Sequence, residues 1–92
     1  MSFALTTTNH FERRARKFLR KHPDLRPIMS DTLERLSEDP FEPSLRLHTL
    51  AGNLSGLQAV SLTHNYRLTL TVQITEQEIV LLDIGSHDEV YW

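Results

Sequence analysis

Two neighbouring segments in the second half of this chain constrain its fold more than any other feature. In RLTLTVQI, residues 67–74, apolar side chains alternate with polar ones, and this alternation predicts a strand with one buried face. The apolar positions are Leu68, Leu70, Val72 and Ile74. EIVLLDI, residues 78–84, is apolar almost throughout, which predicts a strand buried on both faces. A short connection separates the two segments, so we expect them to pair as an antiparallel hairpin.

The first half of the chain begins with a predicted strand and a predicted helix. SFALTTT, residues 2–8, alternates weakly and suits a strand. Asn9, followed by Glu12, resembles a capping box and predicts the start of a helix. Pro23 predicts the end of this helix at His22, because the residue before a proline avoids the α region. Apolar side chains recur at helical spacing, at Phe11, Ala15, Phe18 and Leu19.

A second helix is expected over about residues 24–38, with Pro27 in its first turn, where the missing N–H costs little. Its apolar stripe comprises Leu25, Ile28, Met29, Leu33 and Leu36. After EDPFEP, two more strands are predicted, in LRLHTL (45–50) and LQAVSLT (57–63), with turns at GNLSG and HNY. The order β-α-α-β-β-β-β predicts an α+β fold, with two N-terminal helices packed on one face of a mainly antiparallel sheet of four or five strands.

Charge is distributed unevenly along the chain, although the formal net charge is only −2. Residues 1–35 contain eight Lys or Arg and four acidic residues, whereas residues 36–92 contain two Arg and eight acidic residues. Six of the ten basic residues lie between Arg13 and Lys21. A local basic face of this kind can bind phosphate groups while the whole molecule remains acidic.

Composition also narrows the setting in which the protein works. The chain has no cysteine, which rules out a disulfide framework and a thiolate metal site. No apolar run approaches the roughly 20 residues that a membrane-spanning helix needs. The N-terminal residues lack the basic-then-apolar order of a secretory signal. We therefore expect a soluble, cytoplasmic protein.

Candidate chemical groups gather in the second half of the chain. His48, His64 and His87 lie at or near predicted strand ends, and imidazole can act as an acid or a base near neutral pH. The histidine spacing matches no common metal motif, and no glycine-rich phosphate loop is present. Arg67 begins the alternating strand on its polar face, where a guanidinium can clamp a phosphate. An ordinary solvent-exposed position is the alternative interpretation for each of these residues.

The chain also contains four segments that together form a family pattern: FLRKHPDL, DPFEPSLRLHTLAGNLSGLQAVSL, NYRLTL and LLDIGSHDEVY. In content and order they resemble the RelE/ParE superfamily of bacterial toxins from type II toxin–antitoxin systems, and more closely the YafQ-like mRNA interferases. The resemblance covers nearly the whole chain and implies one RelE-like toxin domain over residues 1–92. It also implies an endoribonuclease that cuts mRNA on the ribosome, without a metal or another cofactor, by attack of a ribose 2′-hydroxyl on the adjacent phosphate.

The resemblance implies catalytic roles for four residues: His48, Arg67, His87 and Tyr91. The two histidines would share the acid and base work, in an order that the sequence leaves open. The arginine would stabilise the charge of the phosphorane. The tyrosine would orient the phosphate or stack on a base.

His64 and Asn65 are additional candidates, because YafQ-like relatives carry another histidine and an aspartate in this region, although the register differs. The resemblance further implies an antitoxin protein, mRNA and the ribosome as partners, and no membrane. A basic helix face would meet ribosomal RNA phosphates through Arg13, Arg14, Lys17, Arg20 and Lys21, unless it is simply solvated. Three alternatives stay open: a ParE-like inhibitor of DNA gyrase, an inactive relative that only binds its antitoxin, and a small unrelated α+β domain.

Overall fold

The computed structural model describes residues 2–50, 52 and 56–86, and it confirms the predicted α+β architecture. The elements, in chain order, are β1 (Ala4–Thr7), α1 (Asn9–Lys21), the 3₁₀ turn η1 (Pro23–Leu25), α2 (Arg26–Glu38), the 3₁₀ turn η2 (Pro43–Leu45), β2 (His48–Thr49), β3 (Gln58–Ser61), β4 (Tyr66–Gln73) and β5 (Glu78–Ser86). Most of the predicted GNLSG turn lies outside the described residues.

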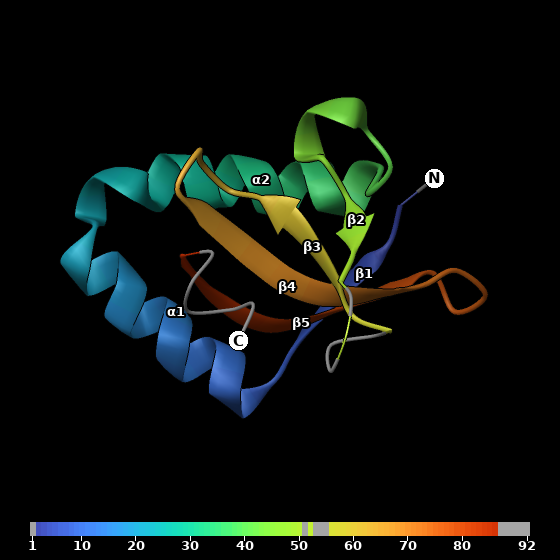
Figure 1. The fold of residues 1–92 in the computed structure, drawn as a ribbon, viewed down its shortest axis with the longest axis horizontal. Helices are drawn as coiled ribbons and strands as arrows, with labels where there is room; N and C mark the ends of the chain where they lie inside the picture. The colour runs from blue at the N-terminus through green and yellow to red at the C-terminus, as the bar shows by residue number, and fades with distance from the viewer. Residues whose placement is uncertain (1, 51, 53–55, 87–92) are drawn as a thin grey trace.

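The five strands form one mixed sheet in the order β1-β5-β4-β3-β2. Strand β1 pairs in parallel with β5, and the other neighbouring strands pair antiparallel. The two helices meet through η1 at one end of the molecule (Figure 1). Both helices and one face of the sheet contribute to a single core, whose buried side chains include Phe11, Phe18, Met29, Leu36, Val60, Leu68, Leu70, Ile79, Leu81 and Ile84.

Helix α1 begins one residue earlier than the capping-box interpretation predicts. Thr8, not Asn9, is the N-cap, and its hydroxyl accepts a hydrogen bond from the backbone N–H of Phe11 at 3.1 Å. The same hydroxyl donates to the carbonyl of Leu81 on β5 at 3.2 Å. A threonine can perform both tasks because its oxygen accepts while its proton donates. The cap therefore also fastens the start of α1 to the sheet.

Helix α1 ends as predicted, with His22 as its C-cap directly before Pro23. Helix α2 starts later than expected, because Pro23–Leu25 forms a separate 3₁₀ turn. Two predicted core residues are wrong. Ile28 is 40% exposed because the buried stripe of α2 runs through Met29, Thr32 and Leu36. Ile74 is 66% exposed because β4 ends at Gln73 and Ile74 lies in the following turn.

Strand β5 contains a β-bulge that the apolar run EIVLLDI conceals. Leu70 pairs with Leu81 and Thr69 pairs with Asp83, so Leu82 is the extra residue. The extra residue reverses the alternation, which lets both Leu81 and Ile84 face the core although three positions separate them. Val80 and Leu82 are half-buried, so the prediction of burial on both faces holds only in part.

Thr69, in the middle of β4, is 4% exposed, and its hydroxyl has no hydrogen-bond partner among the described residues. A buried hydroxyl without a partner costs about 1 kcal/mol or more. We therefore expect Thr69→Val, which keeps the shape and removes the polar atom, to raise the free energy of unfolding by about 1 kcal/mol. Urea denaturation measures this change.

Thr71 supplies the matched control for that substitution, because it is a half-buried threonine of the same strand whose hydroxyl accepts a hydrogen bond from Gln73 at 3.2 Å. Thr71→Val should leave stability unchanged or lower it. A loss of stability in Thr69→Val equal to that in the control would contradict the assignment of an unsatisfied hydroxyl.

Candidate functional site

The strand register places His48 and Arg67 on the same face of the sheet. His48 pairs with Ala59, and Ala59 pairs with Thr69. Residues paired across neighbouring strands project to the same side, and Arg67 shares that side with Thr69 because side chains alternate along a strand. Leu68, between them, faces the core. The two predicted site residues therefore project from the face turned away from the core.

The ring of His48 is exposed, and its Nδ1 atom lies 2.9 Å from the backbone carbonyl oxygen of Arg46. A carbonyl oxygen can only accept a hydrogen bond, so this contact requires a proton on Nδ1. In the neutral ring the lone pair then belongs to Nε2. The contact thus selects the tautomer in which Nε2 can accept a proton.

Arg46 was not among the residues that the sequence suggested. It follows η2 and has a left-handed backbone, with φ 55° and ψ 46°. This conformation aims its carbonyl oxygen at His48 two residues later. No local pattern marks the position, since glycine and asparagine are the residues that usually adopt this conformation.

Arg67 is half-buried at the start of β4, where it pairs with Ser61 on β3 and with Gly85 on β5. Among the residues that the structure describes, no carboxylate forms an ion pair with its guanidinium. An arginine of this kind can accept an anionic ligand without first giving up an internal partner.

The remaining catalytic candidates have different positions. His64 and Asn65 are exposed in the β3–β4 connection, and His64 lines the same cleft as Arg67. The backbone N–H of Asn65 donates to the hydroxyl of Thr63 at 3.2 Å. His87 and Tyr91 lie outside the described residues. Strand β5 ends at Ser86, directly before the first of them, with Gly85 paired to Arg67.

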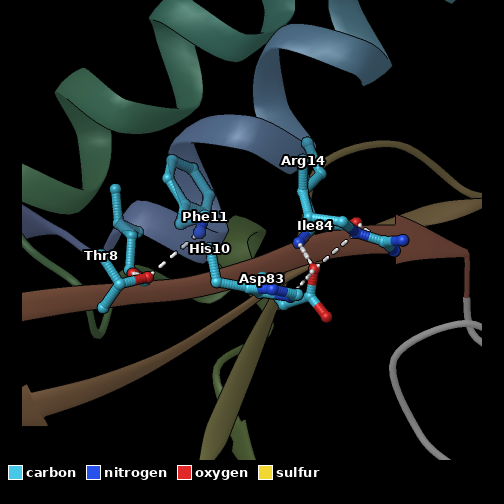
Figure 2. Close-up of polar contacts among 7 residues, drawn as sticks. Thr8, His10, Phe11, Arg14, Asp83 and Ile84 are labelled. Atoms are coloured by element: carbon cyan, nitrogen blue, oxygen red, sulfur yellow. Dashed lines mark hydrogen bonds and ion pairs between the residues drawn. The ribbon is translucent and has the colours of Figure 1, made fainter.

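The five basic side chains of α1 that the resemblance assigned to RNA binding separate into two groups. Arg13, Lys17, Arg20 and Lys21 are exposed, as the sequence predicted. Arg14 instead turns toward the sheet, where its Nε donates to Asp83 at 2.9 Å and its guanidinium also donates to the carbonyl of Ile84 at 3.0 Å (Figure 2). His10 lies 3.5 Å from the same carboxylate. Arg14 therefore positions α1 against β5, a role that sequence reasoning missed.

A hollow of about 280 Å³ lies between the basic side of α1 and the end of β5. Arg14, Lys17 and Lys21 line it from the helix, and Ser86 lines it from the strand. Tyr66 also lines it, with its hydroxyl 3.3 Å from Nε2 of His22. The positive potential of α1 therefore reaches the point where β5 ends.

Two further properties concern metals and membranes. The described part of the chain contains no group of three or more His, Cys, Asp or Glu side chains placed to hold a metal ion. Within the same residues, neither helix has the length and apolarity that crossing a membrane requires.

Comparison with solved structures identifies the fold. A metal-bound toxin from Helicobacter pylori is 22% identical and superposes with a TM-score of 0.78 over 97% of this chain and 99% of its own. YafQ from Escherichia coli is 11% identical, with a TM-score of 0.80 over 98% of this chain and 99% of its own. A chain of the E. coli DinJ–YafQ toxin–antitoxin complex is 11% identical and superposes with a TM-score of 0.78. The match covers 100% of this chain and 100% of the matched one.

This chain therefore has the fold of the YafQ-type toxins, which is the RelE-like fold that its sequence resembles. No model of a protein family matches the sequence. No curated protein sequence matches it either.

The Arg14–Asp83 pair is partly shielded from water, since the two side chains are 33% and 24% exposed. We expect a double-mutant cycle with Arg14→Gln and Asp83→Asn to give a coupling energy of about 1 kcal/mol in urea denaturation. The control pair, Arg35 and Asp31, is 44% and 61% exposed. The same cycle on Arg35→Gln and Asp31→Asn should give about 0.3 kcal/mol. Equal couplings would contradict a positioning role for Arg14.

Proposed function

We propose that this protein is the toxin of a type II toxin–antitoxin system and that it is an endoribonuclease acting on mRNA at the ribosome. The observation that carries the proposal is the pairing register that brings His48 and Arg67 to one face of the sheet. Strand β5 ends beside Arg67 and leads directly to His87. The likeness to YafQ supports the same conclusion through the fold.

In the proposed reaction, His48 is the general base. Its Nε2 takes the proton from the ribose 2′-hydroxyl, while the carbonyl of Arg46 holds the proton on Nδ1. The 2′-oxygen forms a bond to the adjacent phosphorus. This proton transfer leaves His48 as an imidazolium, with a proton on each ring nitrogen. The proposal gives the role of base to His48 and that of acid to His87, an assignment that the sequence left open.

Arg67 stabilises the additional negative charge of the phosphorane. Its guanidinium stays protonated at any working pH and presents several N–H donors to phosphate oxygens. The half-buried position strengthens this interaction, because fewer water molecules screen it. His87 then gives a proton to the 5′-oxygen as the bond from that oxygen to phosphorus breaks. The products are a 2′,3′-cyclic phosphate and a 5′-hydroxyl, and Tyr91 orients the phosphate or stacks on a base.

The proposed partners are a cognate antitoxin, mRNA and the ribosome, and the proposed location is the cytoplasm. YafQ is bound to DinJ in one of the related structures, which supports an antitoxin partner here. Arg13, Lys17, Arg20 and Lys21 offer an exposed basic surface for ribosomal RNA phosphates. Arg14 is occupied by Asp83 and contributes less to this surface.

The roles of His48 and Arg67 can be tested by brief expression in bacteria, with new mRNA 5′ ends mapped across the transcriptome. We expect His48→Ala to lower the cleavage rate about 100-fold or more through loss of the base. Arg67→Gln should lower it about 100- to 1,000-fold through loss of charge stabilisation. His87→Ala should also abolish most cleavage.

His10→Gln is the control for these variants, because His10 is an exposed histidine in the first turn of α1 and has no role in the proposed reaction. It should cleave like the wild type. Growth arrest without new 5′ ends would instead favour a gyrase inhibitor, and neither effect would favour an inactive antitoxin-binding relative.

The chemistry also predicts a strict requirement in the substrate. A synthetic RNA with a single 2′-deoxy nucleotide on the 5′ side of a mapped cut should resist cleavage at that bond, because the nucleophile is missing. Cuts elsewhere in the same molecule should continue at their usual rates. Cleavage at the modified bond would contradict attack by the 2′-hydroxyl.

A further inference from the structure

A cleft of about 460 Å³ lies at the free edge of β3, beside the proposed catalytic face. Strand β2 pairs with β3 only through His48 and Thr49, which face Ala59 and Gln58. On this edge no described strand pairs with β3 past Ala59, whereas the other edge of β3 pairs with β4. Helix α2, the segment after η2 and the β3–β4 connection enclose the resulting space.

The lining of this cleft carries excess positive charge. Arg35 is balanced, because it contacts Asp31 at 3.0 Å and Glu42 at 3.2 Å. Arg46 and Arg67 also line the cleft, and neither forms an ion pair with a carboxylate in the described part of the chain. The hydroxyl-bearing residues Ser61 and Thr63 and the imidazole of His64 complete the polar side. Two unbalanced guanidinium groups beside such donors favour an anionic ligand.

The backbone of Arg46 gives a second, independent indication. A left-handed conformation, with φ 55°, is unfavourable for a residue that has a Cβ atom. Glycine would satisfy the turn and keep the carbonyl contact to His48 without this strain. The turn itself therefore does not need the side chain of Arg46. Strained backbone positions of this kind often coincide with functional sites.

We propose that this cleft binds a phosphate of the RNA strand next to the phosphate held by Arg67. The inference rests on the proposed ribonuclease function and extends it by adding a second phosphate subsite. Arg67 links the two subsites, because it lines the cleft and shares the sheet face of His48. Arg46 supplies the charge of the second subsite, and Ser61, Thr63 and His64 supply hydrogen bonds.

An RNA strand fits these observations better than an acidic protein segment. The cleft opens directly beside the face where the substrate would react, and the same arginine serves both places. On this side of β4, the guanidinium groups of Arg46 and Arg67 have no carboxylate partner among the described residues and can bind phosphate groups. A protein segment held by these arginines would compete with the substrate, and the experiment below separates the two cases.

The test measures binding of a single-stranded RNA in which every ribose is 2′-O-methylated, so that cleavage cannot occur. Fluorescence anisotropy gives the dissociation constant at several salt concentrations for the wild type and for Arg46→Gly. We expect the variant to bind about fivefold more weakly near 0.1 M salt. The slope of log K against log salt should fall by about 0.7, because one phosphate contact is lost.

Two matched controls isolate the effect of the Arg46 side chain. Gln77→Gly removes a side chain from the other non-glycine residue with positive φ among the described residues, at the opposite end of the sheet. Arg26→Gln removes an exposed positive charge at the start of α2, outside the cleft lining. Both controls should bind RNA like the wild type.

If Arg46→Gly fails to fold, Arg46→Asn replaces it, because asparagine tolerates the left-handed region.

The outcomes separate this inference from the proposed function. If Arg46→Gly binds the RNA as tightly as the wild type while unmodified RNA is still cut, the second subsite is wrong and the nuclease stands. If binding weakens as expected but unmodified RNA is never cut, the subsite stands and the nuclease is wrong. If the wild type neither binds nor cuts RNA, both are wrong, and the cleft is better explained as a site for an acidic protein partner.

Discussion

The attachment of α1 to β5 is the contact on which the rest of the structure depends. Strand β5 pairs with β1 on one side and with β4 on the other, so a helix fixed to β5 is fixed relative to the whole sheet. Most of the free energy comes from apolar burial, since Phe11 and Phe18 each contribute roughly 2–3 kcal/mol. The hydroxyl of Thr8 and the guanidinium of Arg14 contribute less, about 1 kcal/mol each. Because they are directional, however, these polar contacts determine where along β5 the helix lies.

The β-bulge at Leu82 controls which side chains of β5 reach each face. Before the bulge, Ile79 and Leu81 face the core opposite Val72 and Leu70. After it, Ile84 takes that role, and Asp83 falls on the opposite side, within reach of Arg14. If the same residues alternated strictly, with no bulge, Asp83 would face the core together with Ile79 and Leu81, and an unpaired carboxylate there is very unfavourable. The bulge therefore allows one strand to serve both the core and the helix contact.

The fold could be predicted largely from local sequence patterns, whereas the site required information about pairing. Pro23 marked the end of α1 correctly, and the alternation of residues 67–74 identified β4. Apolarity alone misplaced Ile28, because it does not show which side of α2 faces the core. It misplaced Ile74 because β4 ends one residue before it. Thr8 was overlooked as the cap because the neighbouring residue, Asn9, is also a favourable capping residue.

The site itself shows why residue type alone was insufficient. That His48 and Arg67 share a face follows from the register of three strands, which no local segment contains. The contact between the Arg46 carbonyl oxygen and His48 depends on one left-handed backbone conformation, which the sequence does not indicate. The bulge was hidden in the apolar run of residues 78–84 and becomes evident only when the buried side chains are known. Leu81 and Ile84 are separated by an odd number of positions, so both can face one core only if an extra residue lies between them.

The distribution of charge on the fold explains how a protein with a net charge of −2 can carry a local basic region. The first residues of β4 separate two positively charged hollows: Tyr66 lines one, with Lys17 and Lys21, and Arg67 lines the other, with Arg46. The acidic residues Glu76 and Glu78 lie at the opposite end of the β4–β5 hairpin. Charges separated by more than a Debye length, about 10 Å in moderate salt, barely influence one another. A phosphate chain near the start of β4 therefore meets local positive potential, and the net charge of −2 is a poor guide to what this protein binds.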